Sequence, residues 1–464
     1  MKRSLNPAHY LVVMTTKRVN YKCAITGCIV TAFALVLAAC SSKPGNTSSP
    51  GAQPQPPATP AITAAERTRR SERIRTYFQE RTRQKAIIAT TRTESGQIID
   101  WIRPESQLPQ GQKLSPAPQA ARANKPSPYT TKVSTYVKAP GVERQAKTEV
   151  QAQPRARGPR GTVPMVRFDV ETYLKNERDL PERPEDVLKK APPPSPDANN
   201  RYYGVWQRFD TFFGTSGRIN IWDTSGPNSG ETSIAQTAVI RGTPMQAIEA
   251  GKIESSPLNG DDLPHFFTYF RTNGQASGDW VGGYNTQVKG WIQVSSSVAP
   301  GMSLASWDST VGGNQYSLDL EVRLWNGNWW IRAAGEWAGY YPLCNGGGGF
   351  SPCSGATLFS EAGIRDKADR LDWYGEVFDS SAPTPTTTDM GSGRFASEAW
   401  AKSAYFRNLT FYWQPATYWW WDSGAPTATD SACYSVSGPF FSQADAWHNW
   451  FYYGGPGKDA QGCK

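Results

Sequence analysis

Histidine is scarce in this chain, and several well-known hydrolase motifs are missing. The 464 residues include three histidines, of which only His265 and His448 lie in the second half. A serine or cysteine nucleophile needs a histidine beside it, and we expect these two to be packed or surface side chains. The sequence contains no G-x-S-x-G, H-E-x-x-H or P-loop pattern. Carboxylates are therefore the hydrolytic groups that remain.

A long apolar run is also absent. The apolar stretch near the N-terminus, residues 24–39, is shorter than the roughly 20 residues of a membrane-spanning helix. It follows a basic segment and ends in Leu37-Ala38-Ala39-Cys40. This order resembles the lipobox of bacterial lipoproteins, in which residues 1–39 are removed as a signal peptide and Cys40 receives lipid. Ser41 favours the outer membrane or cell surface; a transmembrane anchor is the alternative.

Cysteine is absent between Cys40 and Cys344. Three of the seven cysteines lie at or before Cys40, and the four others are Cys344, Cys353, Cys433 and Cys463. An even number in an exported domain predicts two disulfides, and we expect Cys344 to pair with Cys353 and Cys433 with Cys463. No C-x-x-C or metal-type histidine spacing occurs, so we expect neither a metal site nor a cofactor.

Charge and aromatic residues divide the chain in two. Residues 1–200 carry a balance of +16, whereas residues 201–464 carry −7 and hold 17 of the 18 tryptophans. Only the second part can bury a large core. The predicted order is a signal peptide (1–39), a disordered tether (40–62), a prodomain with a helix and a hairpin (63–109), a Pro/Lys/Arg-rich linker (110–160), a lead-in segment (161–200) and the main domain (201–464).

Short runs of β-branched and aromatic residues recur from residue 201 onward. Gly, Asn and Asp separate these runs, and Trp325-Asn326-Gly327-Asn328 is a strong signal for a tight hairpin. Few stretches have the period of a helix. The main domain is therefore predicted to be all-β, an antiparallel β-sandwich.

Two glutamates stand in otherwise apolar or aromatic strand faces. Glu376 shares a face with Tyr374 and Phe378, and Glu249 lies in the middle of an apolar alternating row. Two carboxyl groups a few ångströms apart cannot easily both ionise, so one can take a proton from water while the other donates one, with an optimum in acid. Which glutamate is acid and which is base stays open. Asp422-Ser423-Gly424 offers a weaker, aspartic-protease alternative.

The second part resembles the neprosin family. The resemblance rests on Glu249-Ala250-Gly251, Trp373-Tyr374-Gly375-Glu376-Val377, Met390-Gly391-Ser392-Gly393-Arg394-Phe395 and Phe451-Tyr452-Tyr453-Gly454-Gly455-Pro456-Gly457. It implies a β-sandwich glutamic endopeptidase that cleaves beside proline, with Glu249 and Glu376 as the catalytic pair. Residues 87–109 resemble the family's propeptide, which implies an autoinhibited proenzyme. Proline-containing peptides or proteins are then the substrates, the membrane is reached through the N-terminal lipid, and no nucleic acid partner is expected.

Four further residues are candidates for substrate binding: Gln236, Tyr374, Gly391 and Ser392. Gln236 lies in a run that resembles the family's Ser-x-x-Gln strand, and Gly391 allows a peptide to approach the backbone closely. The chain departs from the family pattern at Lys252, where Trp is usual, and at Asp389, where Gln is usual. We expect both positions to lie close to the site, where they bear on proline specificity more than on endopeptidase activity.

Two other functions fit the same features. An aromatic-rich β-sandwich can bind glycans without catalysis, with Trp419-Trp420-Trp421 as an exposed stacking platform. A glycoside hydrolase also uses two carboxyl groups. Analysis of the products formed from peptides and from oligosaccharides separates these possibilities.

Overall fold

Antiparallel strands are the main secondary structure of the described residues, with one long helix before them and short helices between them. The computed structural model describes residues 64–84, 86–123, 149–175, 201–224, 231–242, 245–272, 282–287, 290–343, 357–379, 386–442, 446–459 and 463, which belong to one compact unit. The predicted signal peptide and tether, with Cys40, and the predicted pair Cys344 and Cys353 lie outside the described residues. No helix of the described part is both long and apolar enough to cross a membrane.

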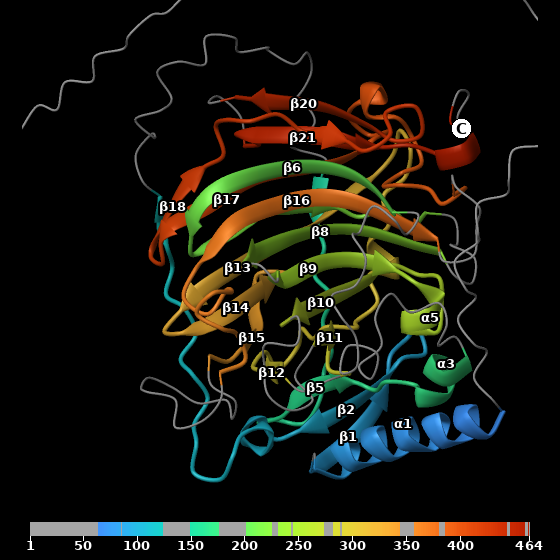
Figure 1. The fold of residues 1–464 in the computed structure, drawn as a ribbon, viewed down its shortest axis with the longest axis vertical. Coiled ribbons are helices and arrows are strands. Elements are labelled where there is room, and N and C mark those ends of the chain that lie inside the picture. The colour runs from blue at the N-terminus through green and yellow to red at the C-terminus, as the bar shows by residue number, and fades with distance from the viewer. Residues whose placement is uncertain are drawn as a thin grey trace, which may run out of the picture. The chain divides into compact units, whose positions relative to one another are not determined.

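The N-terminal part consists of a helix and a small sheet (Figure 1). Helix α1 spans Ala64–Gln84, and strands β1 (Ile87–Arg92) and β2 (Ile98–Ile102) form a hairpin, as the sequence predicts. Strand β5 (Val163–Val166) pairs with β2 and completes a three-stranded sheet. The short helices η1 (Pro104–Gln107) and α3 (Val170–Lys175) follow β2 and β5 respectively. The beginning of the predicted lead-in segment therefore shares a sheet with the hairpin of the predicted prodomain.

Two larger sheets form the main domain. A seven-stranded sheet has the order β11-β10-β9-β8-β16-β6-β19. Its strands are β6 (Arg201–Phe212), β8 (Glu231–Arg241), β9 (Gln246–Glu254), β10 (His265–Arg271), β11 (Gly282–Tyr284), β16 (Ala368–Asp379) and β19 (Thr427–Ala428). The short helix α5 (Ser256–Asn259) follows β9.

An eleven-stranded sheet has the order β12-β15-β14-β13-β7-β17-β18-β3, with β4 beside β13, and β21 joining β20 to β17. Its strands are β3 (Arg122–Ala123), β4 (Glu149–Gln151), β7 (Gly214–Asn220), β12 (Ile292–Gln293), β13 (Gln315–Trp325), β14 (Asn328–Ala333), β15 (Glu336–Tyr341), β17 (Ala404–Gln414), β18 (Thr417–Trp420), β20 (Ser435–Phe441) and β21 (Asn449–Gly454). The 3₁₀ turns η4 (Ala305–Trp307), η5 (Ala396–Glu398) and η6 (Gly457–Asp459) lie in the connections.

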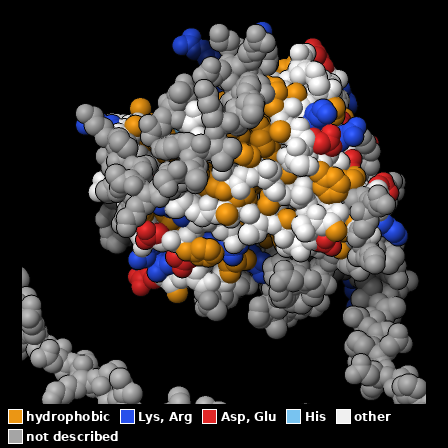
Figure 2. Space-filling view, turned by 90° about the horizontal axis from the view of Figure 1, so that it is seen from above, with side chains coloured by type: hydrophobic (Ala, Val, Ile, Leu, Met, Phe, Trp, Pro, Cys, Tyr) orange, Lys and Arg blue, Asp and Glu red, His pale blue; other side chains and the backbone are white. Residues whose placement is uncertain are grey.

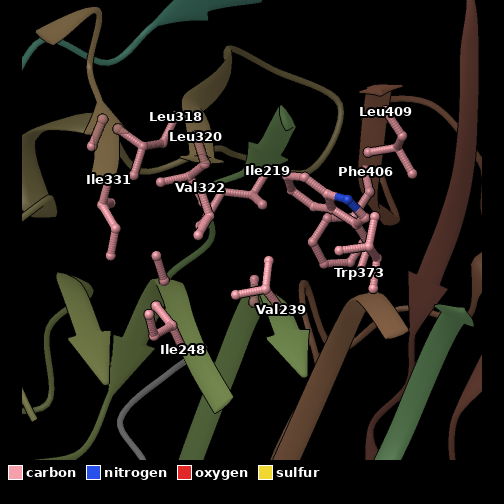
Figure 3. Packing of buried hydrophobic residues seen from close by; sticks show 14 of the residues in the cluster. Ile219, Val239, Ile248, Leu318, Leu320, Val322, Ile331, Trp373, Phe406 and Leu409 are labelled. Carbon is pink, nitrogen blue, oxygen red and sulfur yellow. The ribbon is translucent and has the colours of Figure 1, made fainter. Parts of the chain in front are cut away.

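Alternation along the strands decides which side chains fill the space between the two sheets. In β16, Leu371, Trp373 and Val377 belong to the main core, whereas Tyr374 packs in a separate cluster on the opposite face. Figure 3 shows Val239, Ile248 and Trp373 of the seven-stranded sheet facing apolar side chains of the eleven-stranded sheet, among them Ile219, Val322 and Ile331. The Trp373 indole N–H crosses the core and donates to Thr215 Oγ1 at 2.9 Å. The predicted antiparallel β-sandwich is confirmed.

The Asn326-Gly327 turn has the predicted conformation. It joins β13 to β14, and Trp325 pairs with Asn328 across it. Both turn residues have positive φ, 51° for Asn326 and 75° for Gly327. Asparagine and glycine tolerate this left-handed conformation better than other residues, which explains why the pair marks a two-residue hairpin.

Two pieces of the proline-rich stretch 110–160 lie in strands of the large sheet. β3 pairs in parallel with β18, and β4 pairs in parallel with β13. In β4, the buried Glu149 carboxylate accepts two hydrogen bonds from Arg407, at 2.6 and 2.8 Å, and one from the Tyr405 hydroxyl at 2.9 Å. The composition of the stretch does not reveal this attachment, because these partners lie 256 and 258 residues further along the chain.

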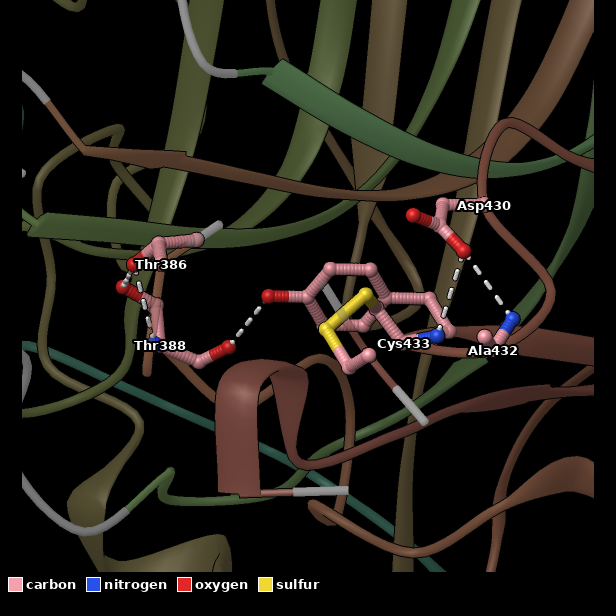
Figure 4. Close-up of a disulfide and its surroundings, with 7 residues drawn as sticks. Thr386, Thr388, Asp430, Ala432 and Cys433 are labelled. Carbon is pink, nitrogen blue, oxygen red and sulfur yellow. Dashed lines mark hydrogen bonds between the residues drawn. A yellow bond between two sulfur atoms is a disulfide. The ribbon is translucent and has the colours of Figure 1, made fainter. Parts of the chain in front are cut away.

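One disulfide joins the C-terminal end to the sandwich. Cys433 and Cys463 are bonded, with their Cα atoms 4.7 Å apart, which is the pairing expected from the sequence. Beside it, the Asp430 carboxylate accepts hydrogen bonds from the backbone N–H groups of Ala432 and Cys433 at 3.0 and 3.4 Å (Figure 4). The disulfide therefore ties the last described residue to a capped turn.

Candidate active site

The two predicted glutamates lie on one face of the seven-stranded sheet, which we call the outer face because it points away from the eleven-stranded sheet. Strand β8 separates them: Ala238 pairs with Glu249 of β9, and Ile234 pairs with Glu376 of β16. Paired residues of antiparallel strands point to the same side, and positions 234 and 238 share a face. The Cα atoms are offset by about 10 Å across the strands and about 13 Å along them. This offset is wider than the few ångströms expected from the sequence.

Gln236 lies on the diagonal between the two glutamates. It pairs with Gly251 on one side and with Tyr374 on the other. Its side chain is buried, and its Nε2 donates a hydrogen bond to Glu376 Oε2 at 2.9 Å. A Cβ added to Gly251 would lie 2.8 Å from the Gln236 Cβ, so the Glu-Ala-Gly motif lets these strands approach closely. Gln236 Oε1 has no hydrogen-bond donor within the described residues, which leaves an acceptor beside the carboxylates.

Arg201 holds the second oxygen of Glu376. The guanidinium of Arg201, at the first residue of β6, donates to Glu376 Oε1, and the side chains are 19% and 6% exposed respectively. The same guanidinium lies over the Phe378 ring, 4.4 Å from its centre. Burial would lower the pKa of Arg201, but the neighbouring Glu376 carboxylate outweighs burial and raises it. Arg201 therefore stays positive and neutralises Glu376 in this structure.

Tyr374 is close to both glutamates and to a third acid, Asp372. Burial raises the pKa of Tyr374 well above its usual value, and the charges of Glu249, Glu376 and Asp372 raise it further. The phenol is therefore a permanent O–H donor. Asp372 lies directly across β8 from Glu249 and is bonded to Arg370 at 2.8 Å. Burial raises the pKa of Asp372 although Arg370 opposes the shift.

Aromatic rings border the other glutamate. Tyr269 of β10 pairs directly with Glu249, and Tyr284 of β11 pairs with Tyr269. The two rings lie on the outer face with their centres 4.8 Å apart. Ring faces of this kind pack well against apolar side chains such as the proline ring.

Helix α1 packs on the outer face beside Glu376. Ile74 of α1 is buried in one cluster with Ile234 and Ile253, the two residues that lie in register with Glu376 across β8 and β9. Phe78 and Phe168 pack against the same cluster, with their rings 4.6 Å apart. Helix α1 thus covers part of the surface that the glutamates share.

Two other candidates do not join this group. Gly391 follows Met390, whose sulfur lies near Gly204 and Gly375 on the inner side of the sheet. A Cβ on Gly391 would meet Ala404 at 2.5 Å, and Ser392 donates to the Lys402 carbonyl at 2.5 Å. The structure therefore places Gly391 and Ser392 in a packed turn on the other side of the sheet from Glu376.

The described residues do not form the exposed tryptophan platform that a glycan-binding site would need. Trp419 and Trp421 are buried in the core, and Trp420 contacts His448 in a tilted arrangement with ring centres 4.0 Å apart, so the three tryptophans do not form an exposed platform. From the side of β20 and β21 the surface is mainly neutral and apolar, with charges near its margins (Figure 2). His265 is buried, with its ring nitrogens 2.8 Å from the Gly301 carbonyl and 2.7 Å from Asp261. No group of potential metal ligands gathers among the described residues.

Arg201, Asp372, Tyr269 and Tyr284 are the residues that the sequence argument missed. The Arg201 contact joins positions 175 residues apart, and the sequence near Arg201 carries no motif that predicts it. Asp372 does carry a signal, since it alternates with Tyr374 and Glu376 in the same strand. Extending the alternation by two residues would have placed it on the same face.

A family model matches the segment of the chain that contains these strands. Residues 229–456 match the model of the family described as Neprosin. The matched segment includes β8, β9 and β16 and therefore Gln236, Glu249, Tyr374 and Glu376. Arg201, α1 and the three-stranded sheet lie before it. The neprosin family is associated with peptidase activity, and residues 229–456 of this chain form a domain of the neprosin family.

Proposed function

We propose that this protein is a glutamic endopeptidase that hydrolyses peptide bonds next to proline on the outer face of the seven-stranded sheet. The observation that supports this most is the common placement of Glu249 and Glu376, with Gln236 and Tyr374 between them. A substrate lying along the diagonal meets both carboxyl groups. The Tyr269 and Tyr284 rings beside Glu249 supply a surface for the proline side chain.

Glu376 acts as the general base, because its contacts keep its carboxylate oriented. Gln236 orients its carboxylate, which takes a proton from the attacking water as the water oxygen bonds to the scissile carbonyl carbon. The Tyr374 O–H donates a hydrogen bond to the resulting oxyanion. Protonated Glu249 gives its proton to the leaving nitrogen as the C–N bond breaks. Activity therefore has an optimum in acid, because it requires Glu249 to carry a proton.

The full-length chain is a proenzyme in this proposal. Ile74 and its neighbours cover the outer face, and Arg201 occupies the Glu376 oxygen that the water must approach. The prodomain is also held by neutral contacts, because the Gln97 and Gln107 amides each exchange two hydrogen bonds with backbone groups of residues 293–303. Protonation of carboxylates in the acidic main domain weakens its attraction to the basic N-terminal part, whereas these amide contacts persist until self-cleavage completes activation. Intact chain persisting after acid incubation would contradict this step.

The N-terminal signal gives the proposed location. Cys40 is lipidated, and the enzyme is held at the bacterial cell envelope, in the outer membrane or at the cell surface. Cys40→Ala should move the protein from the membrane fraction to the soluble fraction. The same fractionation of the wild-type protein is the control.

A digest of a peptide library across pH tests the function. The wild-type protein should cut beside proline in acid, and Glu376→Gln should cut nothing. Oligosaccharides incubated in parallel should stay intact. Release of sugars without peptide cleavage would replace the peptidase by a glycoside hydrolase. Retention on an insoluble polysaccharide that survives loss of both glutamates would instead favour a binding module.

A further inference from the structure

A strap of the proline-rich stretch, residues 108–123, lies on the outward side of the eleven-stranded sheet. It runs along that sheet and ends at β3, beside β18 (Figure 1). Ser115 and Pro118 are buried and Ala121 is half-buried, while the residues between them are exposed. Burial of every third residue is the pattern of a polyproline II helix, which has three residues per turn. The strap thus sits on the sheet as an extended, proline-containing ligand would.

The sheet beneath the strap has a row of aromatic side chains and one arginine. Arg323 of β13 pairs with Trp330 of β14, and Trp330 pairs with Tyr340 of β15, so these three side chains stand side by side on the outward face. Leu108 and Leu114 of the strap pack against Trp330 and Tyr340, with Trp325 and Trp337 at the border of the same cluster. This arrangement matches the aromatic-lined grooves that recognise polyproline II segments.

Hydrogen bonds capture the strap at points spaced along it. The Ser115 N–H donates to the Tyr340 hydroxyl at 3.2 Å, and Asn328 donates to the Ser115 hydroxyl at 2.8 Å. Arg323 donates to the Gln119 carbonyl at 2.7 Å. A polyproline II helix makes no internal hydrogen bonds, so its carbonyls need donors of this kind.

Arg323 is buried beneath the strap and is surrounded by aromatic rings. Its side chain is 1% exposed, and its guanidinium lies 4.9, 5.5 and 5.6 Å from the ring centres of Trp337, Tyr412 and Trp325. Glu321 pairs with it at 3.2 Å. A buried arginine that packs against three rings and donates to a backbone carbonyl binds the peptide backbone rather than a particular side chain. The Trp330 indole N–H has no acceptor within the described residues and offers one more donor.

We propose that this row is a binding site for proline-rich polypeptides in the polyproline II conformation, and that the strap is its resident occupant. When the strap is released, the site holds the proline-rich part of a long substrate. It lies on the opposite side of the sandwich from the glutamates, so it raises the local concentration of long chains and does nothing for short peptides. This role in substrate capture rests on the proposed peptidase function; the binding itself does not.

A variant with a displaced strap tests the binding. Leu114→Asp with Pro118→Asp places two charges at strap positions that are half-buried and buried respectively, and the matched control, Pro116→Asp with Ala117→Asp, places the same charges at exposed strap positions. Both are made in a full-length chain carrying Glu376→Gln, so that no peptide is cut. The probe is a fluorescein-labelled synthetic peptide with the sequence of residues 110–123, followed by anisotropy. Near-ultraviolet circular dichroism checks that each variant is folded.

The displaced variant should bind the peptide at least tenfold more tightly than the control, whose site stays occupied. Adding Arg323→Met should remove at least tenfold of that affinity. An unrelated proline-rich peptide should compete, whereas a Gly/Ser peptide of equal length should not. Equal binding by displaced variant and control, or equal competition by the Gly/Ser peptide, would overturn the proposal.

Hydrogen exchange on the unaltered chain gives a second test that does not depend on folding of a variant. A large excess of the free peptide should speed amide exchange in residues 114–121 and leave β13 protected. Unchanged exchange with peptide in excess would contradict a replaceable strap. Because neither test needs activity, the binding site and the peptidase can fail separately.

Discussion

Shortening Ile74 on helix α1 should activate the unprocessed protein. Ile74 is 7% exposed and packs with Ile234 and Ile253 beside Glu376. Ile74→Ala removes three carbon atoms from this contact, and about 0.8 kcal/mol for each gives about 2.4 kcal/mol. The contact exists only while α1 covers the outer face, so the loss falls on the covered state. A difference of this size raises the uncovered fraction about 50-fold.

The assay is hydrolysis of a quenched fluorescent proline-containing peptide by full-length protein whose integrity is checked on gels. The rate of the Ile74→Ala variant should rise roughly 50-fold while the uncovered fraction stays small. Ile88→Ala is the matched control, because Ile88 belongs to the same N-terminal part but is 48% exposed, and its rate should stay within about threefold of wild type. An Ile74→Ala rate that equals the control would refute the covering role of α1.

Three further changes test separate parts of the account. Arg201→Gln frees Glu376 Oε1 and should raise the activity of the full-length chain; a loss as deep as that of Glu376→Gln would show that catalysis needs Arg201. Burial, with repulsion from Asp459 and Glu231, raises the pKa of Asp389 to about 6 against the attraction of Arg394. The ionised Asp389 carboxylate therefore lowers the stability of the folded state above pH 6, and this loss of stability disappears as the pH falls towards 4. Asp389→Asn should therefore melt higher than wild type at pH 7.5 and equally at pH 4; equal melting at both would count against the shift. Glu149→Gln leaves Arg407 without its charge partner and should lower the free energy of unfolding by about 3 kcal/mol in denaturant titrations, against less than about 0.5 kcal/mol for the exposed Glu105→Gln; similar losses would contradict a structural role for β4.

Local patterns were enough to predict the fold class. The Asn326-Gly327 turn, the hairpin of β1 and β2 and the alternation in β16 depend on neighbouring residues, and each is present. The pairing of Cys433 with Cys463 also follows from few choices. Sequence alternation likewise put Glu376 and Tyr374 on one face.

The features that could not be predicted from the sequence depend on contacts between residues that are distant in the chain. The offset between Glu249 and Glu376 depends on how β9, β8 and β16 pair in register, and the sequence of one strand does not determine this pairing. The strap shows a period of three only in its burial, since its sequence mixes leucine, glutamine, lysine and arginine with small residues and three prolines. The Met-Gly-Ser-Gly motif predicts Gly391 and Ser392 in the site, whereas their turn packs against Ala404 on the other side of the sheet.

Paired removal of the two glutamates tests the central claim most directly. Glu249→Gln, Glu376→Gln and the double variant are compared in kcat/KM on one proline-containing peptide at the pH optimum, with the exposed Glu361→Gln as control. Each single variant should lose about 10³-fold or more. The double variant should lose little beyond the worse single one, because the two carboxyl groups act as a unit. Either single variant keeping a tenth or more of wild-type activity would contradict the account.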